Sequence, residues 1–477
     1  MLMGQIDLDF GDSITGLLVD CENDSFYVGA TLRLTPDEGV VVEVPYVLDG
    51  EVQNFARVRK WFENREIPSA LVLLTTNGAI GLYENRWRSY NEAFGYSVAS
   101  IGRFCPSYSV LGVTLRGSLE SLAVDEIASW IDGLNVWSPV SALSENPIMD
   151  ERGCAESLEI KTESNQIATW SQGGARMELR TTWEGRSTHD GYKQRIFVDG
   201  NVSLVSKFES GAKAAAEHLY EHQKFKDFMT FIFGRQLSFR RHCLRDENVS
   251  ARFVSGSDVA HISSVEFVSA DTVREKVEPI PDMKGLRYPI ASLGENGVEG
   301  LERWGNLYDE WERFILPSAN VLGRKGGIVE DSIISTCMSM EAAASKLESV
   351  EGEECVGARR GQRNVPIAVC VYRCLKVLDV RWPDQIESVE GLSRAIAAVY
   401  NSIKHASRGS FPDGVKVRVV SKINEMIVRL LAVYVAGAGD AVFPRYRQSM
   451  ELLSIAQILS AYDCRIRDDG SWDIGVI

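Results

Sequence analysis

Several features are missing from this sequence, and each absence excludes a class of protein. No apolar run approaches the ~20 residues that a membrane-spanning helix needs, and residues 1–7 lack the basic and apolar segments of a signal peptide. The nine cysteines are scattered without a CxxC pair, which is unlike a disulfide framework or a zinc ribbon. We therefore expect a cytoplasmic protein with free thiols, no membrane contact, no bound metal and no cofactor.

Positive charge is scarce overall but unevenly placed. The formal net charge is −15, which argues against a polyanionic partner. Residues 355–425, however, contain 12 Lys and Arg against six Asp and Glu, a local net charge of +6. An acidic protein with one basic region can bind nucleic acid there, although a solvated helix surface is the simpler interpretation.

The first half of the chain is predicted to be rich in β-strands. Short segments of β-branched and aromatic residues alternate with Asx and Gly turn signals. The segment Met177-Glu178-Leu179-Arg180-Thr181-Thr182-Trp183 alternates as a half-buried strand should. The predicted strands are 14–19, 25–32, 39–44, 70–75, 108–115, 177–183, 195–205, 236–244 and 264–268, with one helix at 210–233 that Gly234 ends.

The character of the chain changes after residues 271–297, which contain Pro279, Pro281 and Pro289 without helical periodicity. Helical patterns follow at 298–314, 333–347, 365–378, 385–407, 415–436 and 447–461, with a break at Pro317 among others. We predict an α+β protein: a β-rich domain at 1–270, a linker at 271–297 and an all-α helical bundle at 298–477.

One predicted helix carries residues that suggest chemistry. On a helical projection of 392–408, the apolar residues Leu392, Ile396, Val399 and Ile403 share one side. The opposite side gathers Arg394, Asn401, His405 and Arg408, with Lys404 at its edge and no acid. His405 is also the only histidine after His261. An imidazole can exchange protons near neutral pH, so this set suits RNA cleavage without metal, although lone surface histidines are common.

The segment Tyr400-Asn401-Ser402-Ile403-Lys404-His405 resembles the motif of HEPN ribonucleases, often Arg-Asn-x-x-x-His, with Asn401 and His405 at the matching positions. The surrounding sequence is similar to the ApeA type of anti-phage protein. The resemblance includes Leu301-Glu302-Arg303-Trp304, then Met338-Ser339-Met340-Glu341-Ala342, which resembles the family's glutamate-bearing helix, and upstream Val110-Leu111-Gly112 and Ile127-Ala128-Ser129-Trp130, which resemble its amino-terminal domain.

The resemblance implies an abortive-infection protein. Its β-rich domain would respond to a phage-derived trigger, and its HEPN domain would cleave RNA, expected to be tRNA, without metal. The implied catalytic residues are His405, Asn401 and Tyr400, and the implied RNA-binding residues are Lys404, Arg408 and Arg394. HEPN domains commonly pair, so a homodimer or higher oligomer through this domain is expected.

One departure leaves the mechanism open. Tyr400 occupies the position of the family's arginine, and a phenol is a poor acid or base at neutral pH. Three interpretations follow. In the first, catalysis is lost and the domain only binds RNA or a protein partner. In the others the missing positive charge is supplied either by Arg394 or Arg408, or by Lys404.

A third hypothesis is a zinc hydrolase. The segment His218-Leu219-Tyr220-Glu221-His222 fits the pattern His-x-x-Glu-His, which can hold Zn²⁺ with the glutamate as base. Nothing downstream singles out a third ligand. The same segment also fits an amphipathic helix with Leu219, Phe225 and Phe228 as packing residues, and this structural interpretation is preferred.

Overall fold

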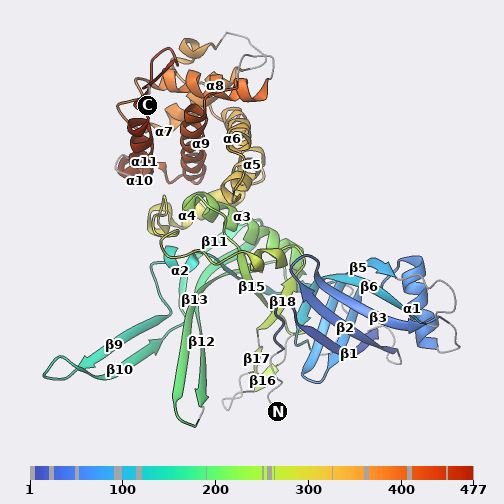
Figure 1. The fold of residues 1–477 in the computed structure, drawn as a ribbon. Helices are drawn as coiled ribbons and strands as arrows, with labels where there is room; N and C mark the ends of the chain where they lie inside the picture. Colours follow the sequence, from blue (N-terminus) through green and yellow to red (C-terminus); the bar gives the residue numbers. More distant parts are fainter. Residues whose placement is uncertain are drawn as a thin grey trace. The chain divides into compact units, whose positions relative to one another are not determined.

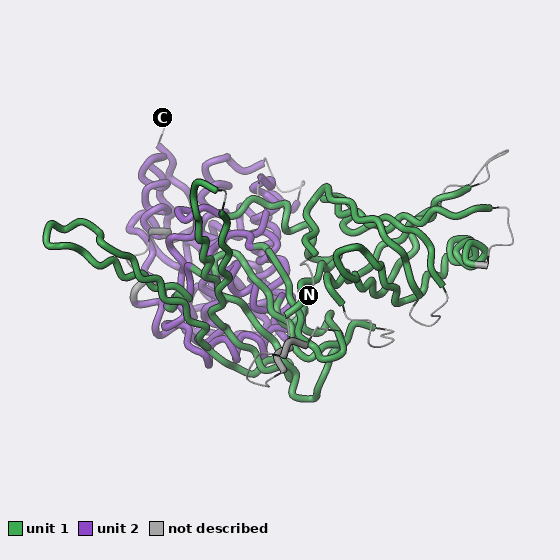
Figure 2. The backbone as a smooth tube through the Cα atoms, turned by 90° about the horizontal axis from the view of Figure 1, so that it is seen from below, with its two compact units in different colours: residues 1–135, 140–222, 238–280 green, residues 136–139, 223–237, 281–477 purple. Residues whose placement is uncertain are grey.

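The computed structural model describes residues 6–20, 26–48, 53–90, 99–113, 121–189, 191–249, 252–254, 260–262, 264–324, 326–358, 365–405, 411–446 and 450–475. They form two compact units (Figure 2). Unit 1 comprises residues 1–135, 140–222 and 238–280, and unit 2 comprises 136–139, 223–237 and 281–477. Unit 1 is built mainly of strands and unit 2 mainly of helices, which confirms the predicted α+β class.

Unit 1 is built on a 12-stranded sheet with the order β11-β12-β13-β8-β15-β18-β6-β3-β2-β1-β4-β5. Because β5 also pairs with β6, the six strands from β6 to β5 close into a ring, and β18 joins this ring to the other strands (Figure 1). The strands are β1 (Ser13–Asp20), β2 (Tyr27–Thr35), β3 (Gly39–Val47), β4 (Ala70–Thr75), β5 (Gly78–Tyr90), β6 (Ala99–Leu111), β8 (Glu126–Ile131), β11 (Gln166–Gln172), β12 (Ala175–His189), β13 (Gln194–Phe208), β15 (Phe239–Arg245) and β18 (Val265–Ser269).

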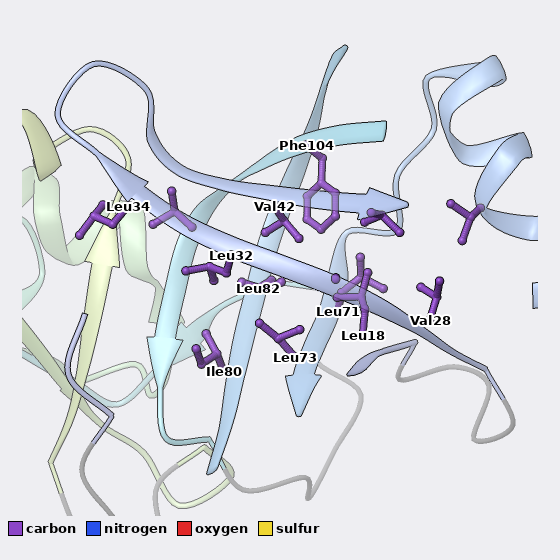
Figure 3. Close-up of a cluster of buried hydrophobic side chains, with 14 of the residues drawn as sticks. Leu18, Val28, Leu32, Leu34, Val42, Leu71, Leu73, Ile80, Leu82 and Phe104 are labelled. Carbon is purple, nitrogen blue, oxygen red and sulfur yellow. The ribbon is translucent and has the colours of Figure 1, made fainter. Parts of the chain in front are cut away.

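The ring encloses a hydrophobic core. Alternate residues of its strands point inward, as the alternating burial along β2 shows, and Leu32, Leu73 and Phe104 are fully buried there (Figure 3). Helix α1 (Gln53–Asn64) adds Phe62, whose ring stacks on Tyr46 with 5.8 Å between centroids. The strand periodicity of the sequence thus reflects a closed apolar interior.

Smaller elements complete unit 1. Helix α3 (Ala215–Phe233) begins in unit 1 and passes into unit 2 at Gln223. The remaining elements are the pairs β7 (Ala123–Val124) with β14 (Lys213–Ala214), β9 (Leu143–Met149) with β10 (Ala155–Thr162), and β16 (Arg252–Val254) with β17 (Ala260–Ile262), and the 3-10 turn η1 (Val273–Val277). The short α2 (Leu134–Trp137) has its first two residues in unit 1 and its last two in unit 2.

Unit 2 is a helical bundle around α9 (Gly414–Val435), most of whose residues are buried. At one end, Trp304 packs on Phe228 and Phe231, with ring centroids 5.2 and 5.8 Å away. The other helices are α4 (Leu293–Leu307), α5 (Glu312–Gly323), α6 (Val329–Ala344), α7 (Ile367–Leu378), α8 (Val389–Lys404), α10 (Gly439–Tyr446) and α11 (Met450–Ala461), with the turn η2 (Glu353–Val356) and the hairpin β19 (Cys464–Ile466) and β20 (Trp472–Ile474).

Two helix predictions in this unit are wrong. The single helix expected at 298–314 is divided between α4 and α5 by a turn at 308–311, where Tyr308 is buried and its hydroxyl donates to Asp227. The break expected at Pro317 is absent, since this proline lies inside α5. Tertiary packing therefore overrides the local sequence signals here. None of the helices in the described parts of the chain is long and apolar enough to cross a membrane.

Candidate functional site

The sequence of α8 fixes where the helix begins and which side it buries. The Ser388 hydroxyl accepts from the Gly391 N–H at 3.1 Å and caps the first turn. Gly391 leaves no room for a side chain, because a Cβ there would lie 2.1 Å from a carbonyl oxygen of the β19–β20 hairpin. Leu392, Ile396 and Val399 are buried as the helical periodicity predicted, so the opposite side and the C-terminal end carry the polar residues.

His405 lies directly after the last residue of α8. Its backbone has left the helix (φ −118°, ψ 96°), while its N–H still donates to the Asn401 carbonyl at 3.0 Å. The side chains of Asn401 and His405 are half-buried. Neither makes a hydrogen bond with the part of the chain that the structure describes.

Tyr400 and Lys404 form a pair one helical turn apart. Tyr400 is 2% exposed, and Lys404 Nζ donates to its hydroxyl at 2.7 Å while lying 4.9 Å from the centre of its ring. Burial raises the pKa of the Tyr400 phenol, and the hydrogen bond to Tyr400 raises the pKa of the Lys404 ammonium. The pair thus holds one positive charge beside His405, since the tyrosine stays neutral and the lysine stays protonated.

Helix α6 brings an acid to this pair. Burial raises the pKa of the half-buried Glu341 carboxyl, and the charge of Lys404 opposes that rise. Glu341 in turn raises the pKa of Lys404 and Tyr400. Glu341 was not among the predicted site residues. The sequence pointed to it only because the segment 338–342 resembles a glutamate-bearing helix of the family. What we call the α8-end site consists of Glu341, Tyr400, Asn401, Lys404 and His405.

A buried polar contact supports the α8-end site from α9. Asn424 is fully buried, and its Nδ2 donates to Thr336 Oγ1 at 3.0 Å and to Cys337 Sγ at 3.4 Å. Both partners lie on α6, one turn before Glu341. Asn424 was not among the predicted site residues, because in the sequence it stands between Lys422 and Glu425 and only its burial in the bundle marks it as a polar contact.

The remaining predicted residues do not join the α8-end site. The Arg394 guanidinium donates to the carbonyl oxygens of Cys355 and Asp468, which lie in η2 and the β19–β20 turn. It also lies about 16 Å along the helix axis from His405. Arg394 therefore ties α8 to two loops, and Arg408 lies outside the described residues.

In unit 1 both ring nitrogens of His218 and one ring nitrogen of His222 make hydrogen bonds within the protein. His218 Nε2 donates to the Val124 carbonyl at 3.1 Å, and its Nδ1 accepts from the Ser206 hydroxyl at 2.7 Å. His222 Nδ1 hydrogen-bonds a buried serine hydroxyl at 2.6 Å, and Glu221 accepts from a buried glutamine amide at 2.8 Å. Burial lowers the pKa of His218 to about 4. Among the described residues, no three His, Cys, Asp or Glu side chains gather as metal ligands, so these groups act as a polar core contact.

Comparison with known proteins identifies the first half of the chain. Residues 20–283 match the family described as ApeA N-terminal domain 1. This range spans more than half of the 477 residues and extends from the closed ring of unit 1 past η1. No curated protein and no solved structure matches the chain. The protein belongs to the ApeA N-terminal domain 1 family.

Proposed function

We propose that this protein acts in anti-phage defence by cleaving RNA, expected to be tRNA, with a HEPN domain formed by unit 2. The ApeA N-terminal domain supports the defence role. In this proposal unit 1 responds to a phage-derived trigger, and the α8-end site performs the cleavage. Pairing of two helical bundles, common among HEPN domains, would bring two such sites together.

The observation that carries the proposal is that an imidazole, an amide and a lysine ammonium held by a hydrogen bond lie together at the end of α8. The His405 imidazole and the Asn401 amide have no hydrogen-bond partner among the described residues, whereas the neighbouring Lys404 charge is held by Tyr400 at 2.7 Å. Both side chains are only half-buried, so water or a ligand can reach them. Free acid–base and amide groups beside a fixed cation suit a phosphodiester substrate.

The proposed reaction is an internal transfer within RNA. The 2′-oxygen attacks the adjacent phosphorus, the bond from phosphorus to the 5′-oxygen breaks, and the products are a 2′,3′-cyclic phosphate and a 5′-hydroxyl. His405 takes the 2′-hydroxyl proton or gives a proton to the leaving 5′-oxygen. Lys404 offsets the charge that builds on the phosphate, and Asn401 donates a hydrogen bond to a non-bridging oxygen.

In this proposal Lys404 supplies the positive charge that the family's arginine supplies in its relatives. Arg394 is engaged with two backbone carbonyls far from His405, whereas Lys404 directly precedes it. A lysine offers a point charge without the bidentate fork of arginine. The second candidate function, RNA or partner binding without cleavage, is favoured by one observation, which is that the family's arginine position holds the buried Tyr400.

The test is incubation of the purified protein with bacterial tRNA, with and without EDTA. We expect discrete fragments ending in a 2′,3′-cyclic phosphate, equal in both conditions, and no cut where a 2′-deoxynucleotide replaces the cleaved position. Fragments that end in a 3′-hydroxyl or that EDTA abolishes would contradict the mechanism. tRNA binding without any cleavage, in the presence of phage lysate, would support the binding function instead.

Removal of the Lys404 charge should slow cleavage strongly. Lys404→Met is expected to lower the cleavage rate by about 10²-fold, the lower end of the loss on removing one charge-stabilising donor. Tyr400→Phe, which removes only the hydroxyl that holds Lys404, should cost about fivefold, the equivalent of one hydrogen bond. The control is Lys422→Met, because Lys422 is an exposed lysine of α9 paired with Glu425. Equal rates for Lys404→Met and Lys422→Met would rule out this role for Lys404.

A further inference from the structure

Three buried histidines lie between helix α3 and the sheet of unit 1. His218 and His222 lie one turn apart on α3, and His242 lies on β15. None of the three is more than 2% exposed. His218 bonds the hydroxyl of Ser206 on β13, and His222 bonds that of Ser129 on β8, which also reaches His242. The first part of α3 is therefore attached to neighbouring strands through imidazole–hydroxyl hydrogen bonds.

The hydrogen bonds of His218 are complete only while its ring is neutral. Its Nε2 lies 3.1 Å from the Val124 carbonyl, which can only accept, so Nε2 carries the proton. Nδ1 is then the acceptor of the Ser206 hydroxyl, at 2.7 Å. A second proton on Nδ1 would place two donors against each other and turn the serine hydroxyl away. Protonation of His218 therefore breaks its bond from β13.

The second ring nitrogen of His222 has no acceptor to receive a proton. The Ser129 hydroxyl lies 2.6 Å from His222 Nδ1 and 2.7 Å from His242 Nδ1, and its single proton can serve only one of them. His242 also bonds Thr272 through Nε2 at 2.8 Å. His222 Nε2 is buried without a hydrogen-bond partner among the described residues. A charged His222 would thus hold an unpaired N–H donor in the interior, which is costly.

Few charges in the described parts of unit 1 compensate a proton on these rings. Glu217 is the one carboxylate there whose charge favours protonated His218, and the charges that act on His222 are those of the other two histidines, which oppose its protonation. The neighbouring Glu221 accepts from the Gln172 amide instead. Burial is the largest cause for both rings. It lowers the pKa of His218 to about 4 and the pKa of His222 well below its ordinary value.

We propose that His218, His222 and His242 form an acid-sensitive attachment of α3 to the sheet of unit 1. Neutral imidazoles hold residues 215–222 on the sheet, and protonation of His218 and His222 favours a state in which this segment has left it. The released segment binds these two protons more readily than the folded one. The stability that the attachment supplies is therefore complete above about pH 6.5 and is lost as the pH falls toward about 4. This switch lies in unit 1 and does not depend on RNA cleavage.

Hydrogen exchange of the full-length protein, measured by mass spectrometry, tests the proposal. The opening constant of a segment is its exchange rate divided by the intrinsic rate at the same pH. Between about pH 6 and about pH 5, the opening constant of residues 215–222 should rise about 50-fold, which is about sevenfold for each of the two histidines. Exposed carboxylates stay ionised over this interval, so the opening constant of β2 in the closed ring should change by less than about threefold.

Two substitutions remove one titrating ring each and retain an amide that can donate or accept. His218→Gln and His222→Gln should each reduce the rise to about sevenfold, because one titrating ring remains. A loss of stability that does not depend on pH raises the opening constant equally at both pH values, so it leaves the ratio unchanged. His189→Gln, at an exposed histidine of β12, is the matched control and should keep the full rise.

The same ratios define the results that overturn the proposal. A wild-type rise of less than about threefold in residues 215–222 would mean that the attachment does not respond to protons. An equal rise in β2 would show that acid opens the whole unit and not α3 alone. The full rise in both glutamine variants would place the titrating groups elsewhere. If one variant fails to fold, the other variant and the wild-type comparison of α3 with β2 still decide.

Discussion

His405→Ala is expected to lower the rate of tRNA cleavage by about 10²–10⁴-fold, the usual contribution of a general acid or base. The variant should fold normally, because the His405 side chain makes no hydrogen bond with the described residues and its place in the structure depends on its backbone N–H, which alanine retains. The rate is measured from the appearance of cyclic-phosphate ends under single-turnover conditions.

Two comparisons isolate the imidazole. His189→Ala removes an exposed histidine of β12 in the other unit and should cleave at the wild-type rate. The affinity of His405→Ala for tRNA should change little, since Lys404 and Asn401 remain. Cleavage by His405→Ala at the wild-type rate would place the acid–base group elsewhere in the molecule.

Arg429→Met is expected to lower the free energy of unfolding by about 2–4 kcal/mol. The last turn of α3 leaves carbonyl groups without intrahelical partners. Arg429 is 7% exposed, and its Nε and Nη2 donate to the carbonyls of Phe231 and Ile232, each at 2.9 Å. Methionine fills similar space without donors, so the Phe231 carbonyl loses the bond from Arg429, while the Ile232 carbonyl loses one bond and keeps that from the Ile290 N–H. Chemical denaturation measures the loss, and Arg418→Met, at an exposed arginine of the same helix, should change it by less than about 0.5 kcal/mol.

Gly234 provides an internal check on this contact. It ends α3 with φ +63°, and an added Cβ would lie 2.8 Å from the Arg429 guanidinium. Gly234→Ala therefore strains the backbone and displaces the arginine as well. The two substitutions should be non-additive, with the double variant losing less than the sum of the single losses. Full additivity would show that the guanidinium and the turn do not interact.

Local periodicity predicted much of the fold because most elements bury one side. The strand expected at 39–44 is part of β3 and that at 70–75 is β4, and the helix expected at 415–436 is α9. The β9–β10 hairpin was missed, since both of its strands are exposed and no strand was recognised from their composition. The division of 298–314 followed from the buried contact of Tyr308 with Asp227, which lies 81 residues away and which no local pattern reveals.

At the candidate site, too, the local pattern did not reveal the tertiary contacts. The helical projection placed Arg394 on the same side as His405, but carbonyl groups 39 and 74 residues away take up its guanidinium. The pairing of Tyr400 with Lys404 follows from their spacing of four residues, whereas the approach of Glu341 depends on how α6 packs in the bundle. Sequence thus indicated the helix and its end, and tertiary structure decided which charges gather there.

Helix α3 has a consequence for dividing this protein into fragments. Its residues up to His222 belong to unit 1, and those from Gln223 belong to unit 2, where the carbonyl of Lys224 accepts from the Trp304 indole at 2.8 Å. The helical bundle is therefore a discontinuous domain. A gene fragment beginning at residue 281 would encode Trp304 and Arg429 without the segment that accepts their hydrogen bonds. Transplanting the effector would require a chain that reconnects residues 223–237 to the bundle, as a circular permutation does.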